Sequence, residues 1–178
     1  MSTNTGPESQ FEETPIDRLK ALGYQYAYGE TVARPNAQAV VLIDRLRRYL
    51  QRRYHDLPPE VIDLAVEQFS NPPGLTPERR NMAFQQLFRS GLTLPYEVDG
   101  REESRHLYAV DFDRPAENEF LVVNQLTIQG AGGNDRRPDL IIYLNGLPLV
   151  VFELKSPYSE YTDINGAQNQ LSHYGHHI

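Results

Sequence analysis

The sequence predicts an α/β fold in which several helices precede a sheet of short, buried strands. In the first half of the chain, apolar residues recur every three or four positions, which is the period of an amphipathic helix. The second half contains two continuous apolar runs rich in β-branched residues, 140–144 and 147–152, that are too short for helices. With 178 residues and 39% hydrophobic content, the chain is long enough for one well-packed domain.

A polar, flexible lead over residues 1–10 and then an opening helix are expected at the start of the chain. Thr14 followed by Pro15 is a typical helix start, because threonine caps the first turn and proline is tolerated at the first helical position. This start leaves Glu12 and Glu13 just outside the helix, as an acidic, solvated lead-in.

A helical insertion is expected over about residues 36–91, ahead of the sheet. Its second helix is expected over 59–69, and its third over 77–90, with a Thr-Pro start and Gly91 as the stop. Its first helix, over about 36–54, carries an apolar stripe formed by Val40, Ile43, Leu46, Leu50 and Tyr54.

Strand-like segments are expected near residues 105–112 and 120–128, followed by two buried central strands over 140–144 and 147–152. Asn145-Gly146 joins the last two strands. This dipeptide is the strongest short signal for a β-hairpin, because both residues tolerate positive φ.

The hairpin brings two acidic signals together, Pro138-Asp139 before its first strand and Glu153-Leu154-Lys155 after its second. Glu153 and Lys155 share a face of their strand, whereas Leu154 points away and leaves its carbonyl near the carboxylates. Oxygen ligands of this kind suit Mg²⁺ or Mn²⁺, and an ammonium beside the ion can orient hydroxide. The residues therefore predict a metal-dependent phosphodiesterase site; the alternative is an ordinary charged strand end in solvent.

A shared ion requires a one-residue shift within this hairpin. The simplest two-residue loop pairs Leu144 with Leu147, and Asp139 then lies opposite Phe152. In that pairing Asp139 and Glu153 lie on opposite faces of the sheet. A three-residue loop or a single bulge moves both carboxylates onto one face, so we expect an odd loop or a bulge.

Residues 120–157 carry a specific combination of motifs. In order, these are Val123-Asn124-Gln125, Arg137-Pro138-Asp139-Leu140, Asn145-Gly146-Leu147-Pro148 and Phe152-Glu153-Leu154-Lys155-Ser156-Pro157. Gln170 and Tyr174 follow with the spacing Q-x-x-x-Y. Together the motifs resemble the N-terminal nuclease domain of the R subunit of type I restriction enzymes. They include the PD-(D/E)xK signature of the restriction-endonuclease-like superfamily and the Q-x-x-x-Y signature of RecB-like nucleases.

The resemblance implies the restriction-endonuclease-like fold, a mixed central sheet flanked by helices. It implies a single nuclease domain over residues 11–178, with the catalytic sheet and helix over about 104–174 and the last core strand missing from the sequence. The implied activity is that of a type I site-specific deoxyribonuclease, an endonuclease that hydrolyses DNA phosphodiesters with Mg²⁺ or Mn²⁺ as cofactor. A cytoplasmic location is expected, because the sequence has no cysteine and so no disulfide.

The resemblance also implies roles for individual residues. Asp139 and Glu153 bind the ion, with the Leu154 carbonyl beside them, and Lys155 positions or activates the attacking water.

Further candidates lie away from the hairpin. The resemblance implies that Gln170 and Tyr174 support the site or contact the DNA backbone, and it makes Glu12 the candidate for a metal ligand near the opening helix. The helix over 36–54 has a basic face that either follows DNA phosphates or is simply solvated and balanced by acids elsewhere. That face is formed by Arg45, Arg48 and Arg52.

Composition and resemblance together indicate the partners. The net charge of −7 argues against a free-standing, non-specific DNA binder, and the lack of cysteine excludes thiolate metal sites. The resemblance implies double-stranded DNA as substrate and methylation and specificity subunits as partners. No membrane association is expected, because no stretch of the sequence approaches the length needed to cross a membrane. ATP binding belongs to the helicase-like translocase domains of the family, which this sequence lacks because it has no P-loop motif. One alternative stays open, a non-catalytic truncated homologue that serves as a DNA- or subunit-binding module.

Overall fold

The computed structural model describes residues 7–130 and 133–154, with side chains from residue 13 onward. These residues form four helices, a mixed four-stranded sheet and a separate hairpin, which confirms the predicted α/β class. The chain divides into two compact units, the first within residues 1–40, 119–144 and 148–178 and the second within 41–118 and 145–147.

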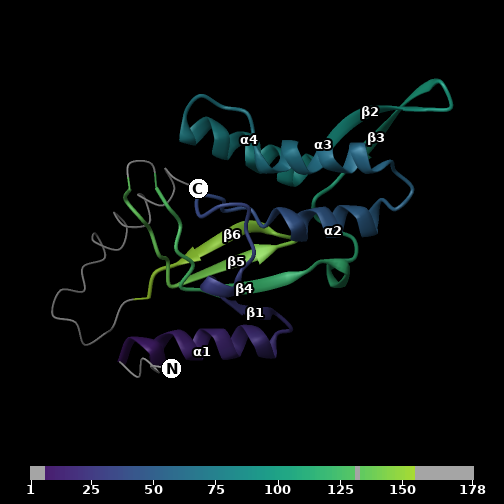
Figure 1. The fold of residues 1–178 in the computed structure, drawn as a ribbon. Coiled ribbons are helices and arrows are strands. Elements are labelled where there is room, and N and C mark those ends of the chain that lie inside the picture. Colours follow the sequence, from purple (N-terminus) through teal and green to yellow (C-terminus); the bar gives the residue numbers. More distant parts are fainter. Residues whose placement is uncertain (1–6, 131–132, 155–178) are drawn as a thin grey trace. The chain divides into compact units, whose positions relative to one another are not determined.

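The first unit is built around the sheet, whose strand order is β1-β4-β5-β6 (Figure 1). β1 runs parallel to β4, and β4 runs antiparallel to β5. A short 3-10 helix, η1, follows β1. The bounds are β1 (Gln25–Tyr28), η1 (Gly29–Thr31), β4 (Phe120–Asn124), β5 (Leu140–Leu144) and β6 (Leu147–Phe152).

Helix α1 (Pro7–Ala21) lies along one face of this sheet (Figure 1). Its buried Ile16 forms a cluster with Val122 of β4 and Leu140 of β5, and removing these side chains from water stabilises the helix on the sheet. Tyr143 of β5 is fully buried, and burial raises the pKa of its phenol against the opposing effect of the Arg34 charge.

Because α1 begins at Pro7, the predicted helix start at Pro15 is wrong. Pro15 lies inside the helix, where it removes one backbone hydrogen bond, whereas Pro7 occupies the first position, whose N–H has no partner within a helix. Residues 7–10 of the expected lead are therefore helical. Glu12 and Glu13 belong to α1 and not to a solvated lead-in.

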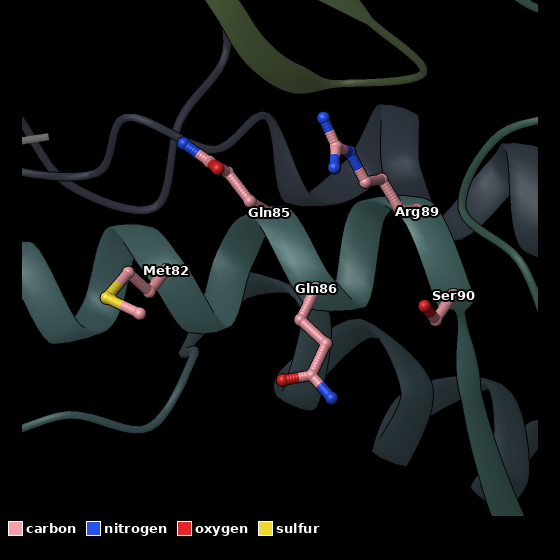
Figure 2. Close-up of a pocket in the computed structure, with 5 residues that line it drawn as sticks. All are labelled: Met82, Gln85, Gln86, Arg89 and Ser90. Carbon is pink, nitrogen blue, oxygen red and sulfur yellow. The ribbon is translucent and has the colours of Figure 1, made fainter.

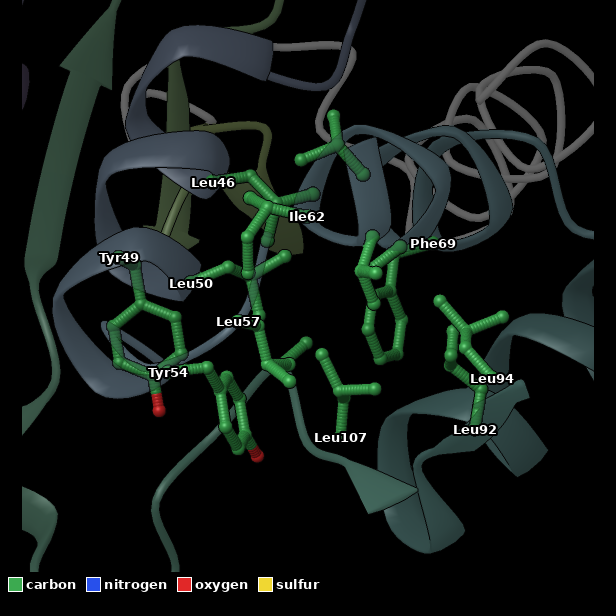
Figure 3. Close-up of a cluster of buried hydrophobic side chains, with 14 of the residues drawn as sticks. Leu46, Tyr49, Leu50, Tyr54, Leu57, Ile62, Phe69, Leu92, Leu94 and Leu107 are labelled. Carbon is green, nitrogen blue, oxygen red and sulfur yellow. The ribbon is translucent and has the colours of Figure 1, made fainter. Parts of the chain in front are cut away.

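The second unit consists of three helices and a two-stranded hairpin around one apolar core (Figure 3). Leu46 and Leu50 of the predicted stripe are fully buried in this core, which also includes Ile62, Phe69 and Leu107. The bounds are α2 (Ile43–Arg53), α3 (Pro59–Ser70), α4 (Pro77–Ser90), β2 (Leu92–Val98), β3 (Arg101–Leu107) and η2 (Pro115–Glu117).

The predicted bounds are confirmed for α3 and α4. At the start of α4, the Thr76 hydroxyl accepts a hydrogen bond from the Arg79 N–H. At its end, Gly91 adopts a φ of 68°, a conformation that glycine reaches without a steric cost. Local capping signals therefore decide both ends of this helix.

The helix predicted from residue 36 begins only at Ile43, as α2. The Asn36 side-chain oxygen accepts hydrogen bonds from the N–H groups of Gln38 and Ala39, at 2.9 and 2.8 Å, which closes a turn instead of a helix. The Arg34 guanidinium donates to the carbonyl oxygen of Ala39 at 3.2 Å. The segment before α2 is therefore held in a non-helical conformation.

The sequence prediction misses β2 and places β3 too late. Asp99 and Gly100, with φ of 51° and 73°, form a tight turn between β2 and β3. β3 ends before Tyr108, whose N–H donates to the Tyr54 hydroxyl at 2.6 Å instead of pairing with a strand. The predicted strand over 105–112 is therefore wrong in its second half.

The sheet differs from the prediction at three places. β1 has only four residues and is missed. β4 ends at Asn124 and not near residue 128, because Gln125 turns out of the extended conformation with a φ of 54°. β5 is a buried central strand as predicted, but within the described residues β6 is an edge strand with Leu149 and Val150 exposed.

Candidate active site

Several chain segments meet at one edge of the sheet in the first unit. Because β1 and β4 are parallel, both end at this edge, and the antiparallel β5 begins there. β6 follows β5 through a tight turn and returns to the same edge (Figure 1). The edge therefore gathers Asn124 at the end of β4, Asp139 before β5 and Glu153 after β6.

Asp139 is held by hydrogen bonds from the segments on both sides of it. Its backbone carbonyl accepts from the Gln125 N–H at 3.1 Å, and its carboxylate Oδ2 accepts from the Leu154 N–H at 2.6 Å. The side chain is half-buried, and the preceding Pro138 is buried. The contact with Leu154 joins the two acidic motifs of the sequence.

Glu153 lies directly beside this contact. Its side chain is half-buried, and its Oε1 atom is shielded from solvent. The flanking residues Phe152 and Leu154 pack against the cluster that contains Leu140 beneath α1. These contacts fix the backbone on both sides of Glu153. The next residue, Leu154, is the one that donates to the Asp139 carboxylate.

The hairpin turn corrects part of our expectation. Asn145 and Gly146 alone join β5 to β6, with φ of 52° and 87°, which is the signature of a two-residue type I′ turn. This turn excludes the three-residue loop, which was one of the two expected alternatives, and leaves the bulge. An unbulged hairpin of this length would place Phe152 on the face opposite to Leu140, yet Phe152 packs against the Leu140 cluster, as a bulge within the hairpin would cause.

The turn itself is part of the second unit. Asn145 is fully buried and donates from Nδ2 to the carbonyl oxygen of Ala109 at 2.9 Å and to Oδ1 of Asn118 at 2.8 Å. The carbonyl of Gly146 accepts a hydrogen bond from the Leu42 N–H at 2.9 Å. Both turn residues are thus fixed by specific contacts.

Asp111 is a buried carboxylate of the second unit with a structural role. It forms ion pairs with Arg53 and Arg114, each at 3.1 Å, and accepts the Arg114 N–H at 2.9 Å. Burial acts to raise the pKa of Asp111, but the Arg114 N–H and the two guanidinium groups hold it below its usual range. The Asp111 carboxylate is already paired with two guanidinium groups, so we do not assign it as a metal ligand.

Four of the predicted site residues lie wholly or partly outside the described residues. Lys155, Gln170 and Tyr174 lie outside the described residues, as does the side chain of Glu12. The backbone of Glu12 belongs to α1, whose C-terminal end is followed by Tyr24 against Phe120 at the start of β4. The N-terminal half of α1 therefore lies toward the edge where β5 begins (Figure 1).

The oxygen donors at this edge fit a hard divalent cation. Asp139 accepts a hydrogen bond from the residue that follows Glu153, and Mg²⁺ usually takes one or two protein carboxylates with water and phosphate at its other positions. In the part of the chain that the structure describes, no group of three or more His, Cys, Asp and Glu side chains is arranged around a common point.

The basic face of α2 lies in the second unit. Arg52 donates to the carbonyl oxygen of Glu117 at 2.8 Å, and Arg47, beside the predicted face, forms an ion pair with Asp63 of α3. Part of the positive charge is therefore balanced locally. Of the three predicted residues, Arg45 is half-buried, and Arg48 and Arg52 are exposed.

Asn124 is a residue of the site edge to which the sequence prediction gave no role of its own. Its Oδ1 accepts a hydrogen bond from the Tyr26 hydroxyl of β1 at 3.0 Å. The available sequence signal is the polar pair Asn124-Gln125 directly after an apolar strand, a position where strand ends present functional side chains.

A shallow hollow on α4 lacks comparable donors (Figure 2). None of its five lining residues is a carboxylate, so it offers no site for a hard cation. It is lined by Met82, Gln85, Gln86, Arg89 and Ser90.

Over the described residues, no helix has the length and apolarity needed to cross a membrane.

Three similar proteins bear the name of endonuclease subunits of type I restriction enzymes. The HindI endonuclease subunit of Haemophilus influenzae is 34% identical over 174 residues, which cover 94% of this chain and 16% of that protein. The putative MjaIXP endonuclease subunit of Methanocaldococcus jannaschii is 30% identical over 158 residues, covering 85% and 15%. The SauCOLORF180P endonuclease subunit of Staphylococcus aureus is 28% identical over 169 residues, covering 94% and 16%.

The chain thus matches a short part of each relative, 15–16% of its length. A family model described as "Type I restriction enzyme R protein N terminus" matches residues 7–178, which is nearly the whole chain. The chain therefore belongs to the family of type I restriction enzyme R protein N termini.

Proposed function

We propose that the chain is the metal-dependent endonuclease domain of a type I restriction enzyme R subunit and hydrolyses DNA phosphodiesters. The observation that carries the proposal is the hydrogen bond of 2.6 Å from the Leu154 N–H to the Asp139 carboxylate. It brings the Asp139 carboxylate to the backbone of the residue after Glu153, which supports a shared role for the two acidic motifs as hard oxygen donors at one sheet edge.

In this proposal Asp139 and Glu153 hold Mg²⁺ or Mn²⁺, with the Leu154 carbonyl as a further donor. The ion, when bound, lowers the pKa of coordinated water and stabilises negative charge on the phosphate. The Leu154 N–H fixes one oxygen of the Asp139 carboxylate and thereby orients the other. The shielded Oε1 of Glu153 favours a strong interaction with a cation, because less water screens it.

The remaining roles follow from position in the sequence and family membership. Lys155 directly follows Leu154 and is proposed to orient or activate the attacking water. Gln170 and Tyr174 are proposed to support the site or contact the DNA backbone. Glu12 is proposed as a further ligand from the half of α1 that lies toward this edge.

Double-stranded DNA is the proposed substrate, within a complex that includes methylation and specificity subunits. The relatives' names as endonuclease subunits support this assignment. ATP is proposed to act only through translocase domains of longer family members. The net charge of −7 is consistent with other subunits providing much of the binding affinity for DNA. Additional phosphate contacts are proposed for Arg45, Arg48 and Arg52.

A plasmid-nicking assay with Mg²⁺ tests the proposal. The wild-type chain is expected to nick supercoiled DNA, and Asp139→Ala and Lys155→Ala are expected to lose at least about a hundredfold in rate, because several kcal/mol of charge stabilisation disappear. The matched control is Asp113→Ala, which removes an exposed carboxylate of the second unit and should retain activity. A wild-type chain without Mg²⁺-dependent nicking, or variants as active as wild type, would contradict the proposal.

A further inference from the structure

We propose that Arg137 is a phosphate-binding residue of the nuclease site, whose guanidinium contacts the DNA backbone beside the ion held at Asp139. This role deepens the proposed nuclease function and rests on it. Three observations carry it: Arg137 lies on the same side of its chain segment as Asp139, it lies within side-chain reach of that residue, and its guanidinium has no partner among the described residues.

Arg137 belongs to a two-stranded ribbon that continues β4 and β5 beyond the sheet. Ile128 and Arg136 exchange backbone hydrogen bonds at 2.7 and 2.8 Å. Their pairing keeps the register in which Asn124 of β4 pairs with Leu140 of β5. The ribbon therefore holds Arg137 at the edge of the sheet where the two acidic motifs meet.

Side-chain burial alternates along this ribbon. On one segment Leu126 is buried and Thr127 is exposed, and on the other the buried Pro138 lies between an exposed Arg137 and a half-buried Asp139. The proline also restricts the residue before it to extended conformations. Because successive side chains of an extended segment point to opposite sides, Arg137 and Asp139 both lie on the side away from Pro138. Two residues of extended chain span about 7 Å, a distance that the long arginine side chain can bridge.

The Arg137 guanidinium has no structural role within the part of the chain that the structure describes, where it forms no hydrogen bond or ion pair. Arg34, which also contacts the ribbon, differs in this respect, because it donates to three carbonyl oxygens, including that of Thr127 at 2.8 Å. The Asp139 carboxylate, the acidic group on the same side, accepts its hydrogen bond from the Leu154 N–H instead. The positive charge of Arg137 is therefore available to an anion that approaches Asp139.

A guanidinium suits the phosphate of a DNA backbone. It stays protonated, and its N–H groups form paired, charge-assisted hydrogen bonds to phosphate oxygens. In a chain whose net charge is −7, a positive group at this edge offsets the repulsion between the carboxylates of Asp139 and Glu153 and an incoming phosphate. Contacts to phosphate carry no information about the base sequence. A DNA duplex of any sequence is the partner that Arg137 fits.

The test is equilibrium binding of a labelled DNA duplex to the chain, followed by fluorescence anisotropy, with Ca²⁺ in place of Mg²⁺. Arg137→Ala is expected to raise Kd about tenfold, as for loss of a hydrogen bond between charged groups, and to reduce the slope of log K against log salt by about 0.9. Arg137→Lys should restore the slope but only part of the affinity, because lysine keeps the charge without the paired geometry. The control is Arg101→Ala, which removes an exposed arginine of the second unit and should bind as wild type does.

Mn²⁺ titration without DNA separates a phosphate contact from a structural role. Removal of a nearby positive charge should not weaken Mn²⁺ binding, and thermal unfolding of Arg137→Ala should equal that of wild type. Weaker Mn²⁺ binding in Arg137→Ala would show that the residue supports the metal site itself, and this result would overturn the proposal. Wild-type Kd and salt slope in Arg137→Ala, or a wild-type chain that does not bind the duplex, would overturn it as well.

Plasmid nicking keeps the two proposals distinct. If nicking depends on Asp139 while Arg137→Ala binds DNA as wild type does, the nuclease function stands and this phosphate contact does not. If the wild-type chain does not nick DNA but Arg137→Ala weakens binding and lowers the salt slope, the phosphate contact stands and the nuclease function does not.

Discussion

Gly146, in the turn between β5 and β6, is expected to be sensitive to substitution for two separable reasons. Its φ of 87° lies in the left-handed region, which costs a residue with a Cβ atom about 1–2 kcal/mol. An added Cβ would also lie 2.5 Å from the Leu42 carbonyl oxygen and 2.8 Å from the Leu46 nitrogen. Relief of this clash would disturb the hydrogen bond from Leu42 to Gly146, worth about 1 kcal/mol. We therefore expect Gly146→Ala to lower the free energy of unfolding by roughly 2–3 kcal/mol.

Urea denaturation followed by circular dichroism measures this loss. Gly100→Ala is a matched control, because Gly100 occupies the same position of a similar tight turn, with a φ of 73°, and no atom lies within 4 Å of its added Cβ. The control should lose only the backbone cost, about 1–2 kcal/mol. Equal losses in the two variants would refute the close packing of the Gly146 turn against the start of α2.

Three further predictions concern stability and binding. Thr76→Ala should destabilise by about 1 kcal/mol in urea, because the Arg79 N–H loses its acceptor; Thr76→Ser should not. Because folding lowers the pKa of Asp111, its stabilising contribution is present above the unfolded pKa and is lost as pH falls through the folded pKa. Asp111→Asn should therefore flatten the acid limb of the stability curve, and an unchanged limb would contradict the Arg53 pairing. If Arg48 contacts a phosphate, Arg48→Ala should reduce the salt slope of DNA binding by about 0.9; an unchanged slope would leave it a solvated residue.

Elements with strong local signals could be predicted from the sequence. Helix α4 is bounded by a threonine cap and a glycine stop, and both act within a few residues of the helix. The β5–β6 hairpin follows from Asn145-Gly146 between apolar runs, because this dipeptide adopts the positive φ values of the turn at small cost. In both cases no distant contact is needed to decide the conformation.

Elements decided by distant contacts could not be predicted in this way. The segment before α2 has apolar spacing that suits a helix, but Arg34 also donates to the carbonyl of Thr127 at 2.8 Å, far along the chain. α1 extends through Pro15 because its packing against the sheet offsets the lost hydrogen bond. Tertiary contacts override local preference at both places.

In the candidate site, too, some features follow from local sequence signals and others depend on distant contacts. The acidic motifs and their meeting through the hairpin follow from spacing, and the contact between Asp139 and Leu154 agrees with that expectation. Of the two expected alternatives, an odd loop and a bulge, the two-residue turn excludes the odd loop. An apolar run gives no clear signal for choosing between them, because a bulge adds a residue without changing the composition of the strand. The hydrogen bond between Tyr26 and Asn124 joins residues 98 positions apart, so only the pairing of β1 with β4 reveals it.

The central claim is that Asp139 and Glu153 hold one shared divalent ion. Calorimetric titration with Mn²⁺ of the wild type, Asp139→Ala, Glu153→Ala and the double variant tests it most directly, without relying on cleavage. A shared ion predicts that each single variant loses nearly as much affinity as the double variant, a strongly non-additive pattern. Additive losses, or wild-type affinity in either single variant, would contradict the claim.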